Sequence, residues 1–434
     1  MLLPMKILLV QKLPYVPTLS GASKKNRILL ELLTKRNHSC RVVAMASFVS
    51  GPEGRSVLLE QLAAKRIRPT SSFAGVDVFH DNGVEVHAVS DQRQLGARLH
   101  DQIRDFDPTW TLISEDRSYL CLAAALEASP SRVVFISHSQ ATLPFGPESF
   151  MTDPTKTELL RRTAGIVAVS NYLKDYLRRW GGLESTVIQF PRYGSGPFSR
   201  FGDFLKGFVT MVNPSAIKGI AIFLELARRL PHVQFAAVPT WATTNHDRFA
   251  LTTCPNVSLL SPSENIDEIF SQTRILLVPS LWGEAVGNVV VEAMLRGIPV
   301  LASNVGGLPE VKLGVDYLLP VRPIERYETQ LDENLLPVPI VPEQDVAPWL
   351  EALQKLLSDR AHYEWLSAAS RYAALDHVSK LGIGPCEDFL QTLAPAQRLE
   401  ASQRNEAREL SSEALHCLSP ERLELFSLLL KKTR

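Results

Sequence analysis

Two glutamates, Glu284 and Glu292, enclose a glycine-containing segment that suits the recognition of a sugar nucleotide. Carboxylates accept hydrogen bonds well from pairs of hydroxyl groups and are poor direct partners for phosphate. Were residues 284–292 one helix, the two carboxylates would sit roughly 80° apart around its axis. We therefore place Glu284 on a loop, facing hydroxyls of a transferred sugar, and Glu292 one turn into a helix, facing ribose hydroxyls. Taken alone, such a pair is more often two solvated surface side chains.

The surrounding residues predict a strand, a turn and a helix. Residues 275–278 are a short apolar run typical of a buried parallel strand. A helix is expected to begin near Asn288 and to end at Gly297, and residues 300–302 open another strand. The first N–H groups of a helix lack partners inside it and form a site for phosphate oxygens. The expected diphosphate-binding residues of this turn are Ala285, Val286, Gly287 and Asn288.

The segment PSLWGEAVGNVVVEAMLRGIPVLASNVGGLPEV resembles the donor-binding segment of GT-B glycosyltransferases of family 4. The resemblance implies that Glu284 touches the donor sugar, that Glu292 binds the ribose, and that amides at the helix start hold the diphosphate. It also implies transfer with retention of anomeric configuration and without a bound metal ion or other cofactor, from a UDP- or GDP-linked donor.

Lys218 and Gly219 match the family's Lys-Gly pair, whose lysine stabilises the departing diphosphate. Many members place an arginine shortly before this lysine, whereas Asn213 stands in that region here, and we include it among the donor-binding candidates. The loss of a guanidinium removes a charge and a bidentate donor. The alternative for Lys218 is an exposed lysine, which would gain nothing from the positive end of a helix dipole.

The first half of the chain offers two further candidates, His138 and Gly21. His138 follows the apolar run 133–137, at the carboxyl end of a predicted strand, where ligands of open α/β sheets bind. Related enzymes place a histidine there against the reacting sugar, although a lone histidine is more often structural. Gly21 ends the loop after the first strand; it either approaches the donor phosphate or simply permits a turn.

Composition limits the class of protein. A chain of 434 residues that is 45% hydrophobic suits two α/β domains, and a formal net charge of zero argues against a nucleic-acid partner. Five scattered cysteines favour neither a disulfide framework nor a zinc site, so we expect a cytoplasmic protein without a bound metal. The apolar start is too short for a transmembrane helix, although peripheral membrane contact is compatible with the pattern.

The expected fold class is α/β with the GT-B architecture, in which two Rossmann-like, doubly wound domains face each other across a cleft and a helical tail follows. The predicted parts are an acceptor-side domain (1–190), a linker (191–202), a donor-binding domain (203–377), a helix returning to the first domain (378–393) and a helical tail (394–434).

The tail ends in LSPERLELFSLLLKKTR, which predicts an amphipathic helix that docks on the enzyme, self-associates or binds another protein. It weakly resembles the LSPE-type helices of nonribosomal peptide and polyketide synthetases, which favours a specialised-metabolite acceptor. The resulting hypothesis is a retaining glycosyltransferase that uses a sugar nucleotide and a small-molecule acceptor. The alternatives are a polysaccharide or lipid-linked saccharide acceptor, and a non-catalytic sugar-nucleotide-binding or scaffold protein.

Overall fold

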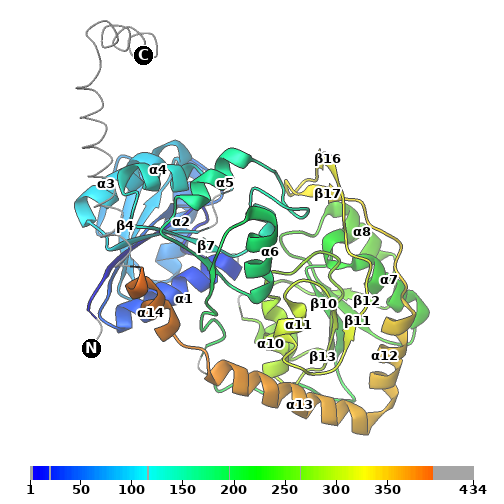
Figure 1. Ribbon diagram of the computed structural model, residues 1–434. Helices are drawn as coiled ribbons and strands as arrows, with labels where there is room; N and C mark the ends of the chain where they lie inside the picture. The colour runs from blue at the N-terminus through cyan, green and yellow to red at the C-terminus, as the bar shows by residue number, and fades with distance from the viewer. Residues whose placement is uncertain (1–2, 19–20, 115–116, 195, 264, 394–434) are drawn as a thin grey trace, which may run out of the picture. The chain divides into compact units, whose positions relative to one another are not determined.

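The computed structural model describes residues 3–18, 21–114, 117–194, 196–263 and 265–393. It divides into two compact units, Met1–Ile383 and Gly384–Arg434. The first unit contains two large sheets, one in the blue to cyan part of the ribbon and one in the green to yellow part of Figure 1. Along the chain, helices alternate with the strands of each sheet, as expected for an α/β fold.

The first sheet has nine strands in the order β3-β4-β5-β2-β1-β6-β7-β8-β9. Its strands are parallel from β5 through β9, whereas β3 and β4 are antiparallel neighbours. The central strand β1 is mainly apolar, and its residues are buried on both faces after the exposed Lys6. This is the pattern of a parallel strand that helices cover on both sides. The strands are β1 (Lys6–Gln11), β2 (Ser39–Met45), β3 (Ser71–Phe73), β4 (Val76–Asp81), β5 (Val84–Val89), β6 (Trp110–Ser114), β7 (Val133–Ser137), β8 (Gly165–Ala168) and β9 (Thr186–Val187).

Helices connect these strands, and a serine side chain caps the start of one of them. Ser170 caps α6 by accepting a hydrogen bond from the Leu173 amide at 3.2 Å. The helices of this half are α1 (Gly21–Lys35), α2 (Pro52–Ala64), α3 (Leu95–Phe106), α4 (Leu120–Ala128), α5 (Pro154–Arg161) and α6 (Asn171–Gly181), with short 3-10 turns η1 (Gln92–Gln94) and η2 (Gln140–Thr142).

The second sheet has six parallel strands in the order β12-β11-β10-β13-β14-β15. Its central strands lie in an apolar core that includes Val209, Leu277 and Leu301. The strands are β10 (Phe208–Val212), β11 (Phe235–Val238), β12 (Val257–Leu259), β13 (Thr273–Val278), β14 (Val300–Ser303) and β15 (Leu318–Leu319), and a separate antiparallel pair is formed by β16 (Tyr327–Leu331) and β17 (Pro337–Pro339).

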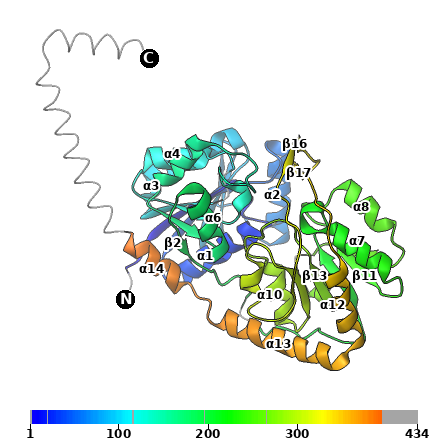
Figure 2. The same cartoon turned by 45° about the vertical axis from the view of Figure 1, so that its right-hand side comes forward.

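The helices of the second half include α10, which begins at Asn288 as predicted, and the long α13, which packs along α10 (Figure 2). The elements are η3 (Ala216–Lys218), α7 (Ile220–Arg229), α8 (Asn245–Thr252), α9 (Asp267–Phe270), α10 (Asn288–Leu295), α11 (Leu308–Val311), α12 (Ala347–Ser358) and α13 (Arg360–Ser379).

The second unit contributes helix α14 (Gly384–Thr392) to the described residues. The stretch expected to form one returning helix, 378–393, is divided, because α13 ends at Ser379 and α14 begins at Gly384. The predicted return of this helix to the first domain stays a prediction. The amphipathic tail helix and the rest of residues 394–434 lie outside the described residues. Within the described ranges, no helix combines the length and the apolar character that crossing a bilayer requires.

Candidate functional site

The start of α10 follows a glycine in a tightly packed turn. Gly287 precedes this helix with a left-handed backbone (φ 78°), and no side chain caps the first turn. A methyl group at Gly287 would approach Leu308 Cδ2 to 2.6 Å, so both backbone conformation and space call for glycine. Uncapped N–H groups and the positive end of the helix dipole make this turn suited to an anion.

The Gly-Gly turn after β14 supports the loop that carries Glu284. The Gly307 amide donates a hydrogen bond to the Glu284 carbonyl oxygen at 2.6 Å. A Cβ atom at Gly306 would collide with the Glu284 backbone, and one at Gly307 would lie 2.7 Å from the Ala285 carbonyl oxygen. This turn therefore lies directly against Glu284 and Ala285.

Lys218 and Glu284 form an ion pair although they are distant in the sequence. Lys218 Nζ donates to Glu284 Oε1, and each side chain is only about one-seventh exposed, at 14% and 13%. Ser280 Oγ donates to the same carboxylate oxygen at 2.6 Å. Burial by itself raises the pKa of Glu284, but Lys218 and Ser280 outweigh it and hold that pKa below its usual range. The two candidates predicted to face the donor sugar and its diphosphate thus meet in one place.

Two tryptophans enclose the Lys218 ammonium group. Its Nζ lies 4.9 Å from the ring centre of Trp282 and 5.9 Å from that of Trp241. The following Gly219 has a left-handed backbone (φ 82°), and a side chain there would collide with the Pro279 carbonyl oxygen. The Lys-Gly pair therefore packs tightly against the end of β13, and aromatic faces screen the lysine from water on one side.

Glu292 lies one turn into α10, as predicted. Its carboxylate makes no hydrogen bond or ion pair to any residue that the structure describes, although its carbonyl oxygen accepts from Arg296 Nη1 at 2.8 Å. Tyr193 of the predicted linker is close enough to feel its charge: burial, and then Glu292, raise the pKa of Tyr193 to about 12. The Glu292 carboxylate is thus free to accept hydrogen bonds from a ligand.

Asn213 has a role that its sequence position did not reveal. It adopts a left-handed conformation (φ 60°) and is buried. Its Oδ1 accepts from the Ala242 amide at 3.1 Å and from Thr243 Oγ1 at 3.4 Å. In this structure the side chain therefore anchors the loop that carries Trp241, and a contact of Asn213 with a donor stays a prediction.

His138 is buried in a polar network of the first half. Its Nε2 lies 2.9 Å from Asn26 Oδ1, and Asn26 Nδ2 donates to Gln11 and Ser114 at 2.9 and 2.8 Å. This network assigns the proton to Nε2 and leaves Nδ1, which has no partner, as an acceptor. Burial, and then the positive charges of Lys25 and Arg192, hold the pKa of His138 well below its usual value. The imidazole is therefore neutral, as the sequence interpretation required.

The two halves approach each other at their helix starts. A Cβ atom at Gly21, the first residue of α1, would lie 3.3 Å from Asn288 Nδ2 at the first residue of α10. Gly21 therefore faces the candidate diphosphate turn.

Two carboxylates hold the halves together near this point. Glu310 accepts from the backbone amides of Asn171 and Tyr172, at 3.0 and 2.7 Å, at the start of α6. Glu148 accepts from the Gly283 amide at 2.7 Å and from the Tyr172 hydroxyl group. The first half thus contacts both the residue before Glu284 and the residues after the Gly-Gly turn.

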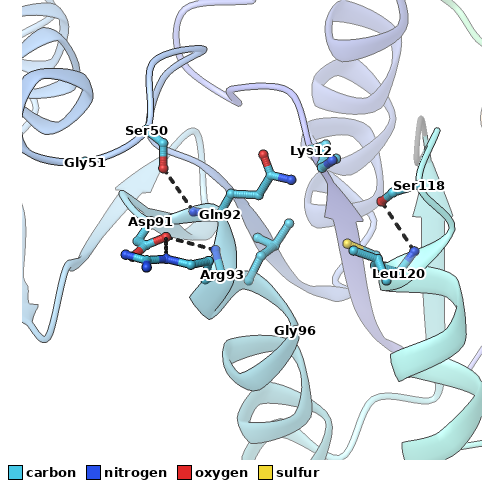
Figure 3. A pocket seen from close by; sticks show the side chains of 11 residues that line it. Lys12, Ser50, Gly51, Asp91, Gln92, Arg93, Gly96, Ser118 and Leu120 are labelled. Atoms are coloured by element: carbon cyan, nitrogen blue, oxygen red, sulfur yellow. Dashed lines mark hydrogen bonds and ion pairs between the residues drawn. The ribbon is translucent and has the colours of Figure 1, made fainter.

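A cavity of about 730 Å³ lies in the first half, at the carboxyl ends of β1, β2, β5 and β6. In Figure 3 the Gln92 side chain extends toward Lys12, while Arg93 turns to its ion-pair partner Asp91 at 2.7 Å. Ligands of open α/β sheets bind at this edge. The lining residues are Lys12, Ser50, Gly51, Asp91, Gln92, Arg93, Leu95, Gly96, Ser118, Leu120 and Cys121.

Sequence reasoning identified none of these lining residues. Glu115 and Asp116, the polar residues that directly follow β6, lie outside the described residues. Polar residues follow each apolar run in the sequence. They indicate a shared cavity only when the order of the strands in the sheet is known. As for metal ions, no cluster of three or more His, Cys, Asp or Glu side chains that could hold one occurs within the described ranges.

Comparisons with known proteins agree with this geometry. Residues 205–359 match the family model described as glycosyl transferases group 1. The Anabaena protein HepE, solved with UDP and glucose, superposes with a TM-score of 0.60 over 90% of this chain and 100% of its own, at 16% identity. The chain has the GT-B fold. The six strands of its second sheet lie within the residues that match this family model, and the predicted fold class is confirmed.

Two relatives match shorter stretches of the GT-B chain. An uncharacterized 42.6 kDa protein in the cps region of Klebsiella pneumoniae is 29% identical over 151 residues, which is 33% of this chain and 39% of that protein. The alpha-1,3/1,6-mannosyltransferase alg-2 of Neurospora crassa is 47% identical over 91 residues, 20% of this chain and 18% of the relative. The chain therefore aligns with less than half the length of each relative.

Proposed function

We propose that the protein is a retaining glycosyltransferase that moves a sugar from a nucleoside diphosphate donor to a hydroxyl group of a saccharide acceptor. The observation that carries this proposal is the buried pair of Lys218 and Glu284 beside the uncapped start of α10 at Gly287. A cation, a hydroxyl acceptor and unpartnered amides together match the three parts of a sugar nucleotide near its reacting bond.

In the proposed complex, the diphosphate lies at the start of α10 and the ribose hydroxyls bind the free carboxylate of Glu292. Glu284 accepts hydrogen bonds from hydroxyls of the donor sugar, and its contacts with Ser280 and Lys218 fix its orientation and charge. His138 offers its neutral Nδ1 to another sugar hydroxyl. The UDP named with HepE supports a uridine donor as the first to test.

The chemical step needs no protein nucleophile. The bond from the anomeric carbon to the diphosphate oxygen breaks, and a bond from that carbon to the acceptor oxygen forms on the same face. The acceptor proton moves to the departing diphosphate oxygen. Lys218 and the α10 amides stabilise the negative charge that develops on this diphosphate oxygen. Electrostatic stabilisation of this kind is usually the largest single contribution to catalysis.

We place the acceptor in the cavity of the first half, whose hydroxyl, amide and charged groups suit a polyol. A saccharide acceptor is supported by the relatives from a cps region and from mannosyl transfer. The competing specialised-metabolite acceptor depended on the tail beyond residue 393, and none of the described contacts favours it.

A donor screen followed by product analysis tests the proposal. At 100 times its dissociation constant, a bound sugar nucleotide adds about 2.7 kcal/mol of stability, so thermal shifts with UDP- and GDP-sugars should identify the donor. With that donor, incubation with oligosaccharides should give product whose anomeric configuration, read by NMR, equals that of the donor. Inversion would refute the retaining mechanism. Binding without transfer or donor hydrolysis would instead favour a sugar-nucleotide-binding protein without catalytic activity.

A further inference from the structure

Arg192, in the predicted linker, is a buried guanidinium group that lacks the partners such groups normally have. Arg192 is only 4% exposed, and its Nε and Nη2 have no hydrogen-bond partner among the described residues. Its Nη1 donates a long hydrogen bond to the Phe190 carbonyl oxygen at 3.5 Å, and its guanidinium lies 4.6 Å from the Tyr193 ring centre. No carboxylate among the described residues forms an ion pair with it.

Such an arrangement is costly for folding. A charge taken out of water is normally paired or fully hydrogen-bonded, and an unpaired buried charge is strongly unfavourable. A guanidinium also presents a planar fork of donors that matches phosphate geometry. The protein keeps this group buried and unsatisfied, which suggests that its partner is a ligand.

Two residues of the candidate donor site interact electrostatically with the segment of Arg192. The charge of Arg192 acts on His138, whose buried Nδ1 has no partner among the described residues. The charge of Glu292 acts on the neighbouring Tyr193. Buried polar atoms without a described partner thus occur on three segments, at His138, in the linker and at Asn288 at the start of α10.

Charges of both signs act near this segment. Arg192 acts on His138 and on His377 at the end of α13, where Asp376 and Lys380 act as well. Glu292 acts on Tyr193. An anion bound at Arg192 would give the guanidinium the partner that it lacks among the described residues.

We propose that Arg192, a buried guanidinium with two unpartnered nitrogens beside His138 and Tyr193, binds the diphosphate of the donor together with Lys218. Lys218 approaches the diphosphate from the second sheet, and Arg192 approaches it from the segment that joins the halves. The inference rests on the proposed function, because it assigns a further residue to the same donor site.

The test uses Arg192→Met, which keeps much of the length of the side chain and removes its charge. The dissociation constants of UDP and GDP, measured by calorimetry, should rise by about 10- to 100-fold, because a hydrogen bond to a charged group is lost. Binding of uridine should not change, since it has no phosphate. Without ligand, the melting temperature should stay the same or rise, because an unpaired buried charge has been removed. Arg200→Met, an exposed arginine of the same linker, serves as the matched control and should bind both nucleotides like the wild type.

The possible outcomes separate this inference from the proposed function. Unchanged UDP and GDP binding in a folded Arg192→Met protein would overturn the role of Arg192 and leave the proposed function standing. If the methionine variant does not fold, Arg192→Gln replaces it, and failure of both to fold would make Arg192 a structural residue and overturn the inference.

Inorganic pyrophosphate provides an independent arm. If the wild type binds pyrophosphate and Arg192→Met does not, the assignment of Arg192 to an anion site is supported even when no sugar is transferred. If the wild type binds neither pyrophosphate nor a nucleoside diphosphate, both proposals fail.

Discussion

The two halves of this GT-B chain present their candidate sites in opposite ways. In the second half, most of the groups of the candidate site lie in one continuous segment from Ser280 to Glu292. Lys218 comes from elsewhere in the sequence and contacts this segment through its ion pair with Glu284. In the first half, the cavity is lined by four loops that are far apart in the sequence and become neighbours because β5, β2, β1 and β6 are adjacent in the sheet. A site built from consecutive residues can be recognised in a sequence, whereas a site built by topology becomes visible only in the folded chain.

The largest expected effect is in the second half. Lys218→Ala should lower kcat/KM by about 10²- to 10³-fold, because the charge that stabilises the leaving diphosphate is lost. Steady-state transfer assays with varied donor measure this. Lys206→Ala, an exposed lysine of the same half, is the matched control and should leave the rate unchanged. Equal rates in both variants would remove Lys218 from the proposed mechanism.

A smaller effect is expected for Glu292→Gln, which keeps the shape and removes the charge. The donor KM should rise about 10- to 100-fold, because hydrogen bonds from ribose hydroxyls to a carboxylate become bonds to a neutral amide. A 2′-deoxyribose donor tests the assignment directly. It should bind the wild type more weakly than the normal donor does, yet bind the Glu292→Gln variant almost equally; an undiminished preference in the variant would contradict the ribose contact.

In the first half, Gly96→Leu should partly fill the cavity without straining the backbone, because a Cβ atom at this helical position would have no atom within 4 Å. The acceptor KM should rise about tenfold, as expected when a ligand meets an overfilled site. Donor hydrolysis in the absence of acceptor should stay constant. Gly382→Leu, also in open space, controls for added apolar surface. A parallel loss of donor hydrolysis would show that the two halves do not divide the substrates as proposed.

The smallest effect concerns the pH dependence of stability in the first half. Burial, and then the charge of Arg98, lower the pKa of His87 on β5 to about 4 despite its bond with Glu85. The unfolded chain, with a histidine pKa of about 6.5, binds the proton more readily between these values. Stability should therefore be complete above pH ~6.5 and fall as the pH approaches 4. Thermal melts of His87→Gln should show a flatter decline, and an identical decline would assign the acid sensitivity to other groups.

Local signals in the sequence predicted much of the fold. The predicted start of α10 near Asn288 and the predicted strand β7 agree with the structure, because apolar periodicity and glycine act within a few residues. The signal for α2, residues 52–64, is weaker. Only Gly54, Leu58 and Leu62 of that helix are buried, and its cap residue, Gly51, offers no side chain, so the helical pattern is weak.

The candidate site was predictable to the extent that single residues carry its chemistry. Glu284 and Lys218 were expected in one place and meet there, and Glu292 lies on the expected helix. The anchoring role of Asn213 depends on a loop thirty residues away. Arg192 was read as part of a linker rich in Gly, Pro and Ser, because the absence of a partner for a buried arginine is a property of the folded state alone.

The contact of Glu310 with the start of α6 has a consequence for the construction of chimeras. One carboxylate from the second half satisfies two backbone amides of the first half, while Glu148 satisfies an amide in the reverse direction. Recombining the first half of this chain with the second half of a relative would leave these amides without acceptors unless both acidic residues travel with their partners. Grafting the loops around the cavity would leave both contacts in place, whereas joining whole halves would not.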